Sequence, residues 1–437
     1  MSFERVRLGQ VARFINGRAY KNSEFKTEGT PIVRIQNLSG GGKTVYSDLE
    51  LPADKYIDKY DLIYAWSATF GPHIWKGQKS IYHYHIWKVE PFKGTDKYYL
   101  YYLLKLISDQ ISIQGTGSIF AHITKGLMES YEVDVLPYKE QVRVSRILKS
   151  IDDKIQINQQ TNQTLEQIAQ AIFKSWFVDF TPVKAKISAL AAGGSEEDAL
   201  LAAMQAISGK DKAQLAQLQS ENPERYNQLR TTAELFPSAM QDSELGEIPE
   251  GWQNGALADI ARFSKDKIAT SELTVATYIS TENMLENKKG ITEASTVSSA
   301  SSVPKFNPKQ VLISNIRPYF KKIWFANKTG GRSPDVLGFE SKTSDSEEFL
   351  YNTLFQDCFF EYMMLTSKGA KMPRGDKKAI MQFPVVIPCS NIMRAFCQRV
   401  KPFYIFIAEN NQECLNLESL RDTLLPHLLS GQLGVHN

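Results

Sequence analysis

The strongest pattern in the chain is a run of apolar positions spaced alternately four and three residues apart. An average spacing of 3.5 residues is typical of a helix that packs along a narrow seam against another helix. The pattern predicts one helix from Val142 to Val178, about 55 Å long at about 1.5 Å per residue. Its positions are Val144, Leu148, Ile151, Ile155, Asn158, Asn162, Leu165, Ala169, Ile172 and Trp176.

The same pattern returns 252 residues later, and nine of its ten positions keep a residue type suited to a seam. The exception is Arg421, which we expect to carry its charge outward along its aliphatic stem. Pro402 is expected to kink this second helix or delay its start. The positions are Phe396, Val400, Phe403, Ile407, Asn410, Cys414, Leu417, Arg421, Leu424 and Leu428.

Asn158 and Asn410 occupy equivalent seam positions, and a buried asparagine is a device that fixes register at some cost in stability. The matched pair favours two helices that pack on each other, although each helix packing only on its own domain stays an alternative. The predicted pairing residues are Leu148, Ile151, Ile155, Asn158, Leu165 and Ile172 with Phe403, Ile407, Asn410, Leu417 and Leu424.

The segments that precede the two helices are also repeated, at an offset near 250 residues. Val11–Phe14 matches Ile260–Phe263, Tyr60–Gly77 matches Lys309–Ala326, Lys125–Met128 matches Lys378–Met381, and Val133–Pro137 matches Pro384–Pro388. Short β-branched and aromatic runs in both copies predict strands. These runs are Pro31–Ile35, Leu62–Trp66, Ile81–Val89 and Val311–Ile316.

The predicted fold class is therefore α+β, with two tandem mixed α/β domains separated by two long helices that form an antiparallel coiled coil with pseudo-two-fold symmetry. Between the copies, Ala189–Gly246 predicts a helical connector, which opens a helix with a capping box at Ser195 and continues with helices at Asp211–Gln219 and Pro223–Leu235. The predicted boundaries are 1–137 for the first domain, 138–186 for its long helix, 187–245 for the connector, 246–388 for the second domain and 389–437 for the last helix.

Composition narrows the class of protein further. The 437 residues are 42% apolar and 23% charged, which is ordinary for a globular chain. We see no signal peptide, no apolar run long enough for a membrane span and no paired cysteines among the four present, so we expect a reduced, cytoplasmic protein. Although the net charge is only +3, stretches 5–23, 62–89 and 294–334 are basic and contain no carboxylate side chain, which favours a bound polyanion.

Catalytic motifs are weak by comparison. Ser39–Thr44 resembles a phosphate-binding loop but has Asn37 where that loop needs glycine, so we expect a turn. Asp335, Glu340 and Lys342 resemble the acidic pair and lysine of metal-dependent nucleases, which keeps a stand-alone nuclease open as an alternative. A protein-only adaptor is a second alternative.

The order of these features resembles the specificity subunit of type I restriction–modification enzymes along nearly the whole chain. The resemblance is carried by the tandem units, by Gln167–Lys186, by Glu244–Trp252 and by the strand segments Asp61–Ser67 and Val311–Pro318. It implies a non-catalytic subunit in which each domain reads one half of a split, asymmetric DNA sequence. It further implies two modification subunits that methylate adenine with S-adenosylmethionine, and restriction subunits that use ATP and Mg²⁺; no cofactor and no metal are expected in this chain.

If the chain binds DNA, basic and amide side chains in the β-rich parts are the candidate contacts. Lysine and arginine neutralise phosphates, whereas arginine, asparagine and glutamine hydrogen-bond to base edges. In the first copy these are Arg13, Arg18, Lys21, Arg34, Gln36, Asn37 and Lys76. In the second they are Lys265, Lys267, Asn315, Arg317, Lys321, Lys322, Arg332, Lys371 and Arg374.

Overall fold

A computed structural model describes residues 3–38, 42–67, 70–114, 123–369 and 371–431, so the start of the phosphate-loop-like pattern, 39–41, lies outside the described residues. The chain forms two compact units. The first unit consists of 1–159 with 411–437, and the second consists of 160–410. Each unit therefore contains part of the helix near the middle of the chain and part of the helix at its end.

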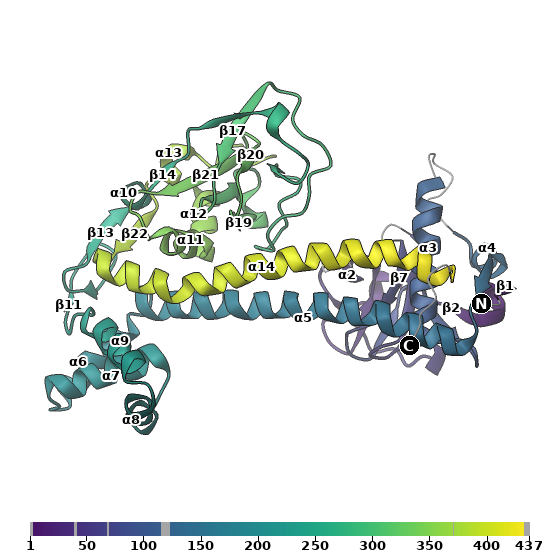
Figure 1. Cartoon of the computed structure of the whole chain (residues 1–437), viewed down its shortest axis with the longest axis horizontal. Coiled ribbons are helices and arrows are strands. Elements are labelled where there is room, and N and C mark those ends of the chain that lie inside the picture. The colour runs from purple at the N-terminus through teal and green to yellow at the C-terminus, as the bar shows by residue number, and fades with distance from the viewer. Residues whose placement is uncertain (1–2, 39–41, 68–69, 115–122, 370, 432–437) are drawn as a thin grey trace. The chain divides into compact units, whose positions relative to one another are not determined.

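The first unit is built around two four-stranded sheets (Figure 1). One sheet has the order β2-β9-β6-β7 and is antiparallel throughout; the other has the order β4-β3-β8-β5 and pairs β3 with β8 in parallel. β1 pairs with β10. The strands are β1 Glu4–Arg7, β2 Ala12–Asn16, β3 Thr30–Val33, β4 Val45–Ser47, β5 Tyr56–Ile57, β6 Leu62–Ala65, β7 Gly71–Ile74, β8 Ser80–Tyr82, β9 Ile86–Pro91 and β10 Glu132–Val135. The helices outside the long pair are α1 Leu8–Val11, α2 Ile35–Leu38, α3 Lys97–Gln114 and α4 Lys125–Ser130.

The second unit repeats this plan. Its antiparallel sheet has the order β14-β21-β18-β19, and its other sheet has the order β15-β17-β20-β16 with β16 parallel to β20. The strands are β11 Met240–Gln241, β12 Ile248–Pro249, β13 Gln253–Ala256, β14 Ala261–Phe263, β15 Lys267–Ala269, β16 Tyr278–Ile279, β17 Ser302–Phe306, β18 Val311–Ser314, β19 Ile323–Phe325, β20 Gly330–Arg332, β21 Val336–Ser341 and β22 Pro384–Ile387. The short helices are α10 Leu257–Ile260, α11 Glu347–Phe355, α12 Asp357–Leu365 and α13 Lys377–Ile380.

The strand pairings make most of the two copies equivalent in register. In the antiparallel sheets Leu62 pairs with Val89 where Val311 pairs with Phe339. In the mixed sheets the three strands β3-β8-β5 correspond to β16-β20-β17, but the fourth strand lies on opposite edges, since β4 pairs with β3 and β15 pairs with β17. The duplication therefore preserves the centre of each sheet and varies one edge.

One predicted strand is wrong. The run Ile81–Val89 forms two strands, β8 and β9, joined by a turn at 83–85. This turn is closed by a hydrogen bond from the Ile86 N–H to the His83 carbonyl. Hydrophobic content alone did not reveal the break, because the turn residues His83, Tyr84 and His85 are themselves aromatic.

The long helices are α5, Tyr138–Phe177, and α14, Ser390–Leu429. The seam pattern predicted that the first helix ends at Val178, and it ends at Phe177. The predicted segment 138–186 is not one continuous helix, because Phe180 takes a left-handed conformation and α6 begins at Thr181. Pro402 does not delay the second helix, which begins at Ser390. At this break Phe180 is buried against Trp252, with ring centroids 5.7 Å apart.

In each unit a segment of α5 lies antiparallel to a segment of α14 (Figure 1). In the first unit Ile151, Ile155 and Cys414 form a buried cluster, and the Asn158 Nδ2 donates to Glu413 Oε2 at 2.7 Å. In the second unit the Asn410 Nδ2 donates to Asn162 Oδ1 at 2.8 Å. The paired, antiparallel helices and the tandem α+β plan confirm the predicted fold class.

The depth of burial departs from the ideal seam in two places. Phe173 and Tyr404 are buried, whereas the predicted Ile172 and Phe403 are only half-buried. The reason is that these helix segments also pack on α11, where Phe173 meets Phe349 at 5.6 Å between ring centroids. Of the other predicted pairing residues Leu148, Ile151, Ile155, Asn158 and Asn410 are buried, and Leu165, Ile407, Leu417 and Leu424 are half-buried.

Arg421 does not carry its charge outward as expected. Its side chain is largely buried and its Nη1 donates to Asp152 Oδ1 on α5 at 2.8 Å. The same carboxylate accepts a hydrogen bond from the Tyr102 hydroxyl of α3 at 2.6 Å. Neighbouring carboxylates raise the pKa of Arg421 despite its burial, so the one charged seam position is a paired charge inside the helix contact.

The connector in the second unit is helical, as predicted. Its helices are α6 Thr181–Ala191, α7 Glu196–Ser208, α8 Lys212–Glu221 and α9 Pro223–Glu234. Ser195 forms the predicted capping box with Asp198, and Asp211 caps α8 in the same way. Buried residues such as Ala203 and Leu229 join these helices to the core of the unit.

Candidate nucleic-acid interface

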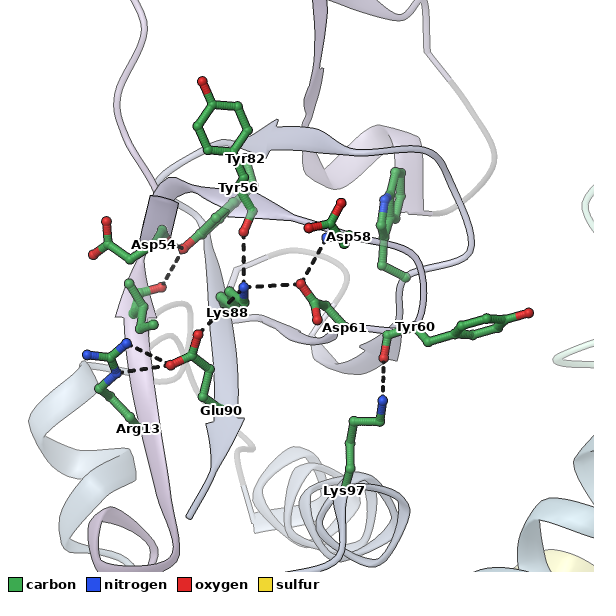
Figure 2. Close-up of polar contacts among 12 residues, drawn as sticks. Arg13, Asp54, Tyr56, Asp58, Tyr60, Asp61, Tyr82, Lys88, Glu90 and Lys97 are labelled. Atoms are coloured by element: carbon green, nitrogen blue, oxygen red, sulfur yellow. Dashed lines mark hydrogen bonds and ion pairs between the residues drawn. The ribbon is translucent and has the colours of Figure 1, made fainter. Parts of the chain in front are cut away.

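Arg13, a predicted DNA contact, is used in a structural pair. It lies on β2 directly opposite Glu90 of β9, and its Nη2 reaches Glu90 Oε2 at 2.7 Å (Figure 2). The second unit has the same pair at the equivalent register, Arg262 with Glu340 at 2.9 Å. Because both copies keep this cross-strand pair, it belongs to the common scaffold of the two units.

A half-buried lysine stands beside this pair in the first unit. Figure 2 shows Lys88, whose Nζ lies 3.2 Å from Asp61 Oδ2 and 3.5 Å from Glu90 Oε1, and which donates to the Tyr56 carbonyl at 3.2 Å. Above it the Tyr82 hydroxyl donates to the Asp54 carbonyl at 2.8 Å. Lys88 is therefore engaged within the unit, and its charge is not available to a ligand in the way that an exposed lysine's is.

Arg332 is wrong as a predicted DNA contact, because its side chain is only 6% exposed. Its guanidinium donates to the Val336 carbonyl at 2.5 Å and to the Ser264 carbonyl at 3.2 Å. Burial lowers the pKa of Arg332 to about 10. Gly338 makes this possible, since a Cβ there would lie 2.7 Å from the Arg332 Nε.

The other two arginines and the two lysines of the first copy are half-buried or exposed, and several of them have intramolecular partners. Arg18 forms two hydrogen bonds with Glu24 and lies over the Tyr20 ring, and Arg34 donates to the Lys43 carbonyl at 2.6 Å. Lys76 is exposed and hydrogen-bonds to Gln156 of α5, away from the strands. Lys21 and Gln36 are exposed, and Asn37 accepts a hydrogen bond from the Arg34 N–H.

An aromatic cluster in the first unit lies outside the predicted contacts. Tyr84, at the tip of the β8–β9 turn, is 41% exposed and lies against His83 and His85, with ring centroids 4.4 and 3.9 Å away. Trp66 follows β6 and packs on His85 at 5.0 Å. Burial lowers the pKa of His83 first, and the nearby His85 and Arg34 lower it further. The signal was present as three consecutive aromatic residues, but an unbroken strand predicted alternating faces for them.

In the second copy Lys265 and Lys267 are exposed on and just before β15. Lys321 pairs with Asp357 at 2.9 Å, and Lys322 donates to the Thr281 carbonyl at 2.8 Å, so both are anchored within the unit. Asn315 is buried and donates to the Gly375 carbonyl at 3.2 Å.

The remaining second-copy candidates converge in two loops. The Arg317 N–H donates to the Pro373 carbonyl at 2.9 Å, and Ile316 forms an isolated bridge with Arg374. The Arg374 Nη2 lies 3.3 Å from Asp335. Arg317, Lys371 and Arg374 are all exposed, and these backbone contacts bring the loop of Arg317 next to the loop of Arg374.

The nuclease alternative fails on geometry. Asp335 precedes β21 and Glu340 lies near its end, which puts about 16 Å of extended strand between them at about 3.3 Å per residue. Glu340 is held by Arg262 and Gln310, and Asp335 by Arg374. Within the described residues no group of three or more potential ligands is placed to hold a metal ion.

No helix in the described ranges has the length and apolar character needed to cross a membrane. Comparison with known proteins adds what the geometry alone does not give. A family model described as the type I restriction modification DNA specificity domain matches residues 2–167.

Two curated relatives match most of the chain. The type I restriction enzyme HindI specificity subunit of Haemophilus influenzae is 31% identical over 335 residues, which is 73% of this chain and 73% of that protein. The type I restriction enzyme MjaIX specificity subunit of Methanocaldococcus jannaschii is 22% identical over 361 residues, 79% of this chain and 71% of that protein.

A solved structure shares the fold. The S subunit of a type I restriction–modification system from M. genitalium aligns over 98% of this chain and 96% of its own, with a TM-score of 0.50 and 13% sequence identity. At that identity the likeness concerns architecture alone.

Proposed function

This chain belongs to the specificity subunits of type I restriction enzymes, and we propose that it reads a bipartite, asymmetric DNA target with one domain for each half-site. It is the DNA-recognition subunit of its system and is itself non-catalytic. The observation that supports one domain for each half-site is the equivalent register of the two antiparallel sheets and of the three central strands of the mixed sheets, which gives one chain two similar but non-identical surfaces. The proposed recognition domains are 1–137 and 246–388.

The partners follow from this role. The chain binds DNA and the other subunits of its restriction–modification system; in our proposal it recruits two modification subunits, one for each repeat, together with restriction subunits. S-adenosylmethionine, ATP and Mg²⁺ belong to those partners, and the complex works in the cytoplasm, where its DNA target is. Two partner copies are supported by the internal repeat, because equivalent surfaces bind equivalent partners.

An exchange of domains tests this proposal. Residues 1–137 are replaced by the corresponding segment of a relative, the chimera is expressed with its modification subunit, and methylated adenines are mapped by sequencing. The exchange changes one half-site and leaves the other intact. A chimera that changes both half-sites, or neither, contradicts the two-domain reading.

We further propose that the helix pair sets the spacer between the half-sites. α5 and α14 each have 40 residues, about 60 Å at about 1.5 Å per residue, and a packed pair holds a fixed length where a flexible linker does not. Matched insertions of four residues near Asn162 and Asn410 should lengthen the spacer and keep both half-sites. An unchanged spacer would contradict this part of the proposal.

The protein-only adaptor makes a different prediction about salt. DNA binding through lysine and arginine weakens steeply as salt rises, because phosphate contacts release counterions. We expect the complex with the modification subunits to lose affinity for its target between 50 and 200 mM salt, by roughly 10³-fold for about six phosphate contacts. Binding that is absent or independent of salt would favour the adaptor.

A further inference from the structure

In both units the residue just after one strand of the antiparallel sheet, β6 or β18, is hydrogen-bonded to the turn that precedes β9 or β21. We call this backbone contact the corner of the unit. In the first unit the Trp66 N–H, just after β6, donates to the His85 carbonyl in the β8–β9 turn at 3.1 Å. In the second unit the Asn315 N–H, just after β18, donates to the Asp335 carbonyl in the β20–β21 turn at 2.8 Å. Since Leu62 and Val311 are equivalent, Trp66 and Asn315 are equivalent, and so are His85 and Asp335.

The side chains at these corners differ completely in chemistry. The first corner consists of Trp66, His83, Tyr84 and His85, and is aromatic, with the Trp66 Nε1 donating to the Tyr84 carbonyl at 2.8 Å. That bond fixes the turn, so that the exposed Tyr84 ring is presented on an ordered backbone.

The second corner consists of Arg317, Asp335 and Arg374. Arg374 is oriented by Asp335, and Arg317 is exposed with no described residue accepting a hydrogen bond from its guanidinium. Arg317 also has a left-handed backbone, φ 50°, which a non-glycine residue rarely adopts. Lys321, at the other end of the same 3₁₀ turn, has the same φ. Strained backbone of this kind is concentrated at ligand-binding and active sites.

The two halves of an asymmetric target differ, so the residues that read them must differ between the units. The Arg13–Glu90 and Arg262–Glu340 pairs are the same in both units and cannot discriminate between half-sites. The corners combine a shared backbone position with different exposed side chains, which is the property that a half-site reader requires.

We propose that the two corners are the base-reading surfaces, an inference that rests on the proposed function. In the second unit Arg317 and Arg374 read guanine, since a guanidinium pairs with guanine O6 and N7 in the major groove. In the first unit Tyr84, supported by His83, His85 and Trp66, reads an A·T pair through apolar contact of its ring with the thymine methyl group.

The test uses the complex of the full chain with its modification subunits and a set of duplexes in which each base pair of the mapped target is changed in turn. Arg317→Gly removes the side chain and tolerates the left-handed backbone. It should reduce discrimination at one G·C pair of one half-site by about 10- to 100-fold and leave the other half-site unaffected. Arg317→Lys keeps the charge but not the fork, and should reduce discrimination at the same pair while preserving the salt dependence of binding.

The first corner is tested in the same way. Tyr84→Ala should weaken discrimination at one A·T pair of the opposite half-site, whereas Tyr84→Phe, which keeps the ring, should retain it. Matched controls are Arg262→Ala and Tyr138→Ala, which remove exposed side chains of the same types outside the corners and should leave every position unchanged.

The outcomes separate this inference from the proposal on which it rests. If domain exchange still moves one half-site but neither Arg317 variant nor Tyr84→Ala changes discrimination at any base pair, the corners are not the readers and the two-domain function stands. The corner inference is equally overturned if Arg317→Gly and Tyr84→Ala act on the same half-site. If domain exchange itself moves neither half-site, the proposed function fails.

Discussion

In the first unit the positive charge beside Glu90 comes from Lys88 on β9, whereas in the second unit the equivalent position is Gly338 and the charge comes from Arg332 on β20. The residue equivalent to Arg332 in the first unit is Tyr82. Tyr82 donates to the Ile15 carbonyl at 3.4 Å, and Arg332 donates to the equivalent Ser264 carbonyl. In the first unit two strands supply these groups, with the cation from Lys88 on β9 and the bond to the carbonyl from Tyr82 on β8, whereas in the second unit Arg332 on β20 supplies both.

The side-chain contacts that join α3 or α11 to the long helices also differ between the two units. In the first unit Tyr102 of α3 contacts Asp152 of α5, which pairs with Arg421. In the second unit the equivalent link runs from Asn352 of α11 to Tyr404 of α14 at 2.9 Å, and Tyr404 contacts Glu166 of α5 at 3.5 Å. The ion pair of Asp152 with Arg421 in the first unit is therefore replaced in the second unit by Glu166, a buried carboxyl group whose pKa is raised.

The largest effect is expected from copying one residue of the first unit into the second. Gly338→Lys places a second cation against Arg332, where even a Cβ is too close, and should lower the free energy of unfolding of the second unit by about 3–5 kcal/mol. Hydrogen exchange of residues 302–341 in the full chain measures it. Adding Arg332→Tyr and Gln310→Asp, which completes the arrangement of the first unit, should restore much of the protection. A Gly338→Lys variant that is as protected as the parent would contradict the equivalence of Lys88 and Gly338.

The Glu166 carboxyl group should make the stability of the second unit fall as pH rises towards neutrality. Burial raises the pKa of Glu166 to about 7, against 4.5 unfolded, so the protonated form favours folding and stability is lost as pH rises from 4.5 to 7. Glu166→Gln should remove this loss, worth about 2–3 kcal/mol above pH 7. The measurement is exchange of residues 160–177, corrected for intrinsic rate, at pH 5 and 8.

Tyr404→Phe serves as the matched variant for that experiment. It deletes a hydrogen bond that favours ionised Glu166, so the pH-dependent loss should extend to higher pH. A parent protein whose exchange is independent of pH would show that Glu166 titrates normally.

The hydrogen bonds of the two seam asparagines should contribute different amounts to the free energy of unfolding. Asn158 donates to the charged Glu413, whereas Asn410 donates to the neutral Asn162. Asn158→Ala should therefore cost about 1.5–3 kcal/mol and Asn410→Ala about 0.5–1.5 kcal/mol. Urea unfolding followed by circular dichroism compares them, and an equal or reversed order would refute the comparison.

The smallest effect concerns the pair that both units keep. Arg13→Ala and Arg262→Ala remove exposed ion pairs with the same register and should each cost less than about 1 kcal/mol, by similar amounts. Thermal unfolding detects the difference; a large effect at only one position would mean that the two pairs are not equivalent.

The helices, the repeat and the fold class could be predicted from the sequence because each rests on periodicity over many residues, as the run from Val144 to Trp176 does. The break at Phe180, after which α6 begins as a separate helix, could not, because Phe177 and Phe180 continue the apolar pattern across it. The turn at His83–His85 was likewise hidden by its own aromatic residues.

The candidate contacts were harder to predict, because a basic residue reads the same in sequence whether it faces solvent or a buried carbonyl. Arg332 and Arg317 lie fifteen positions apart in one carboxylate-poor stretch, yet one is buried and the other exposed. Only the glycine at 338 marks the difference, and its meaning depends on a strand pairing that the sequence does not state.

The exchange of the cation between strands limits how genes for such chains can recombine. A crossover between the segments that encode β8 and β9, or β20 and β21, would join Lys88 to Arg332 in one product and Tyr82 to Gly338 in the other. The first product carries two opposed cations and the second carries none. Recombination that preserves a single cation at this place must therefore keep β8 together with β9, and β20 together with β21.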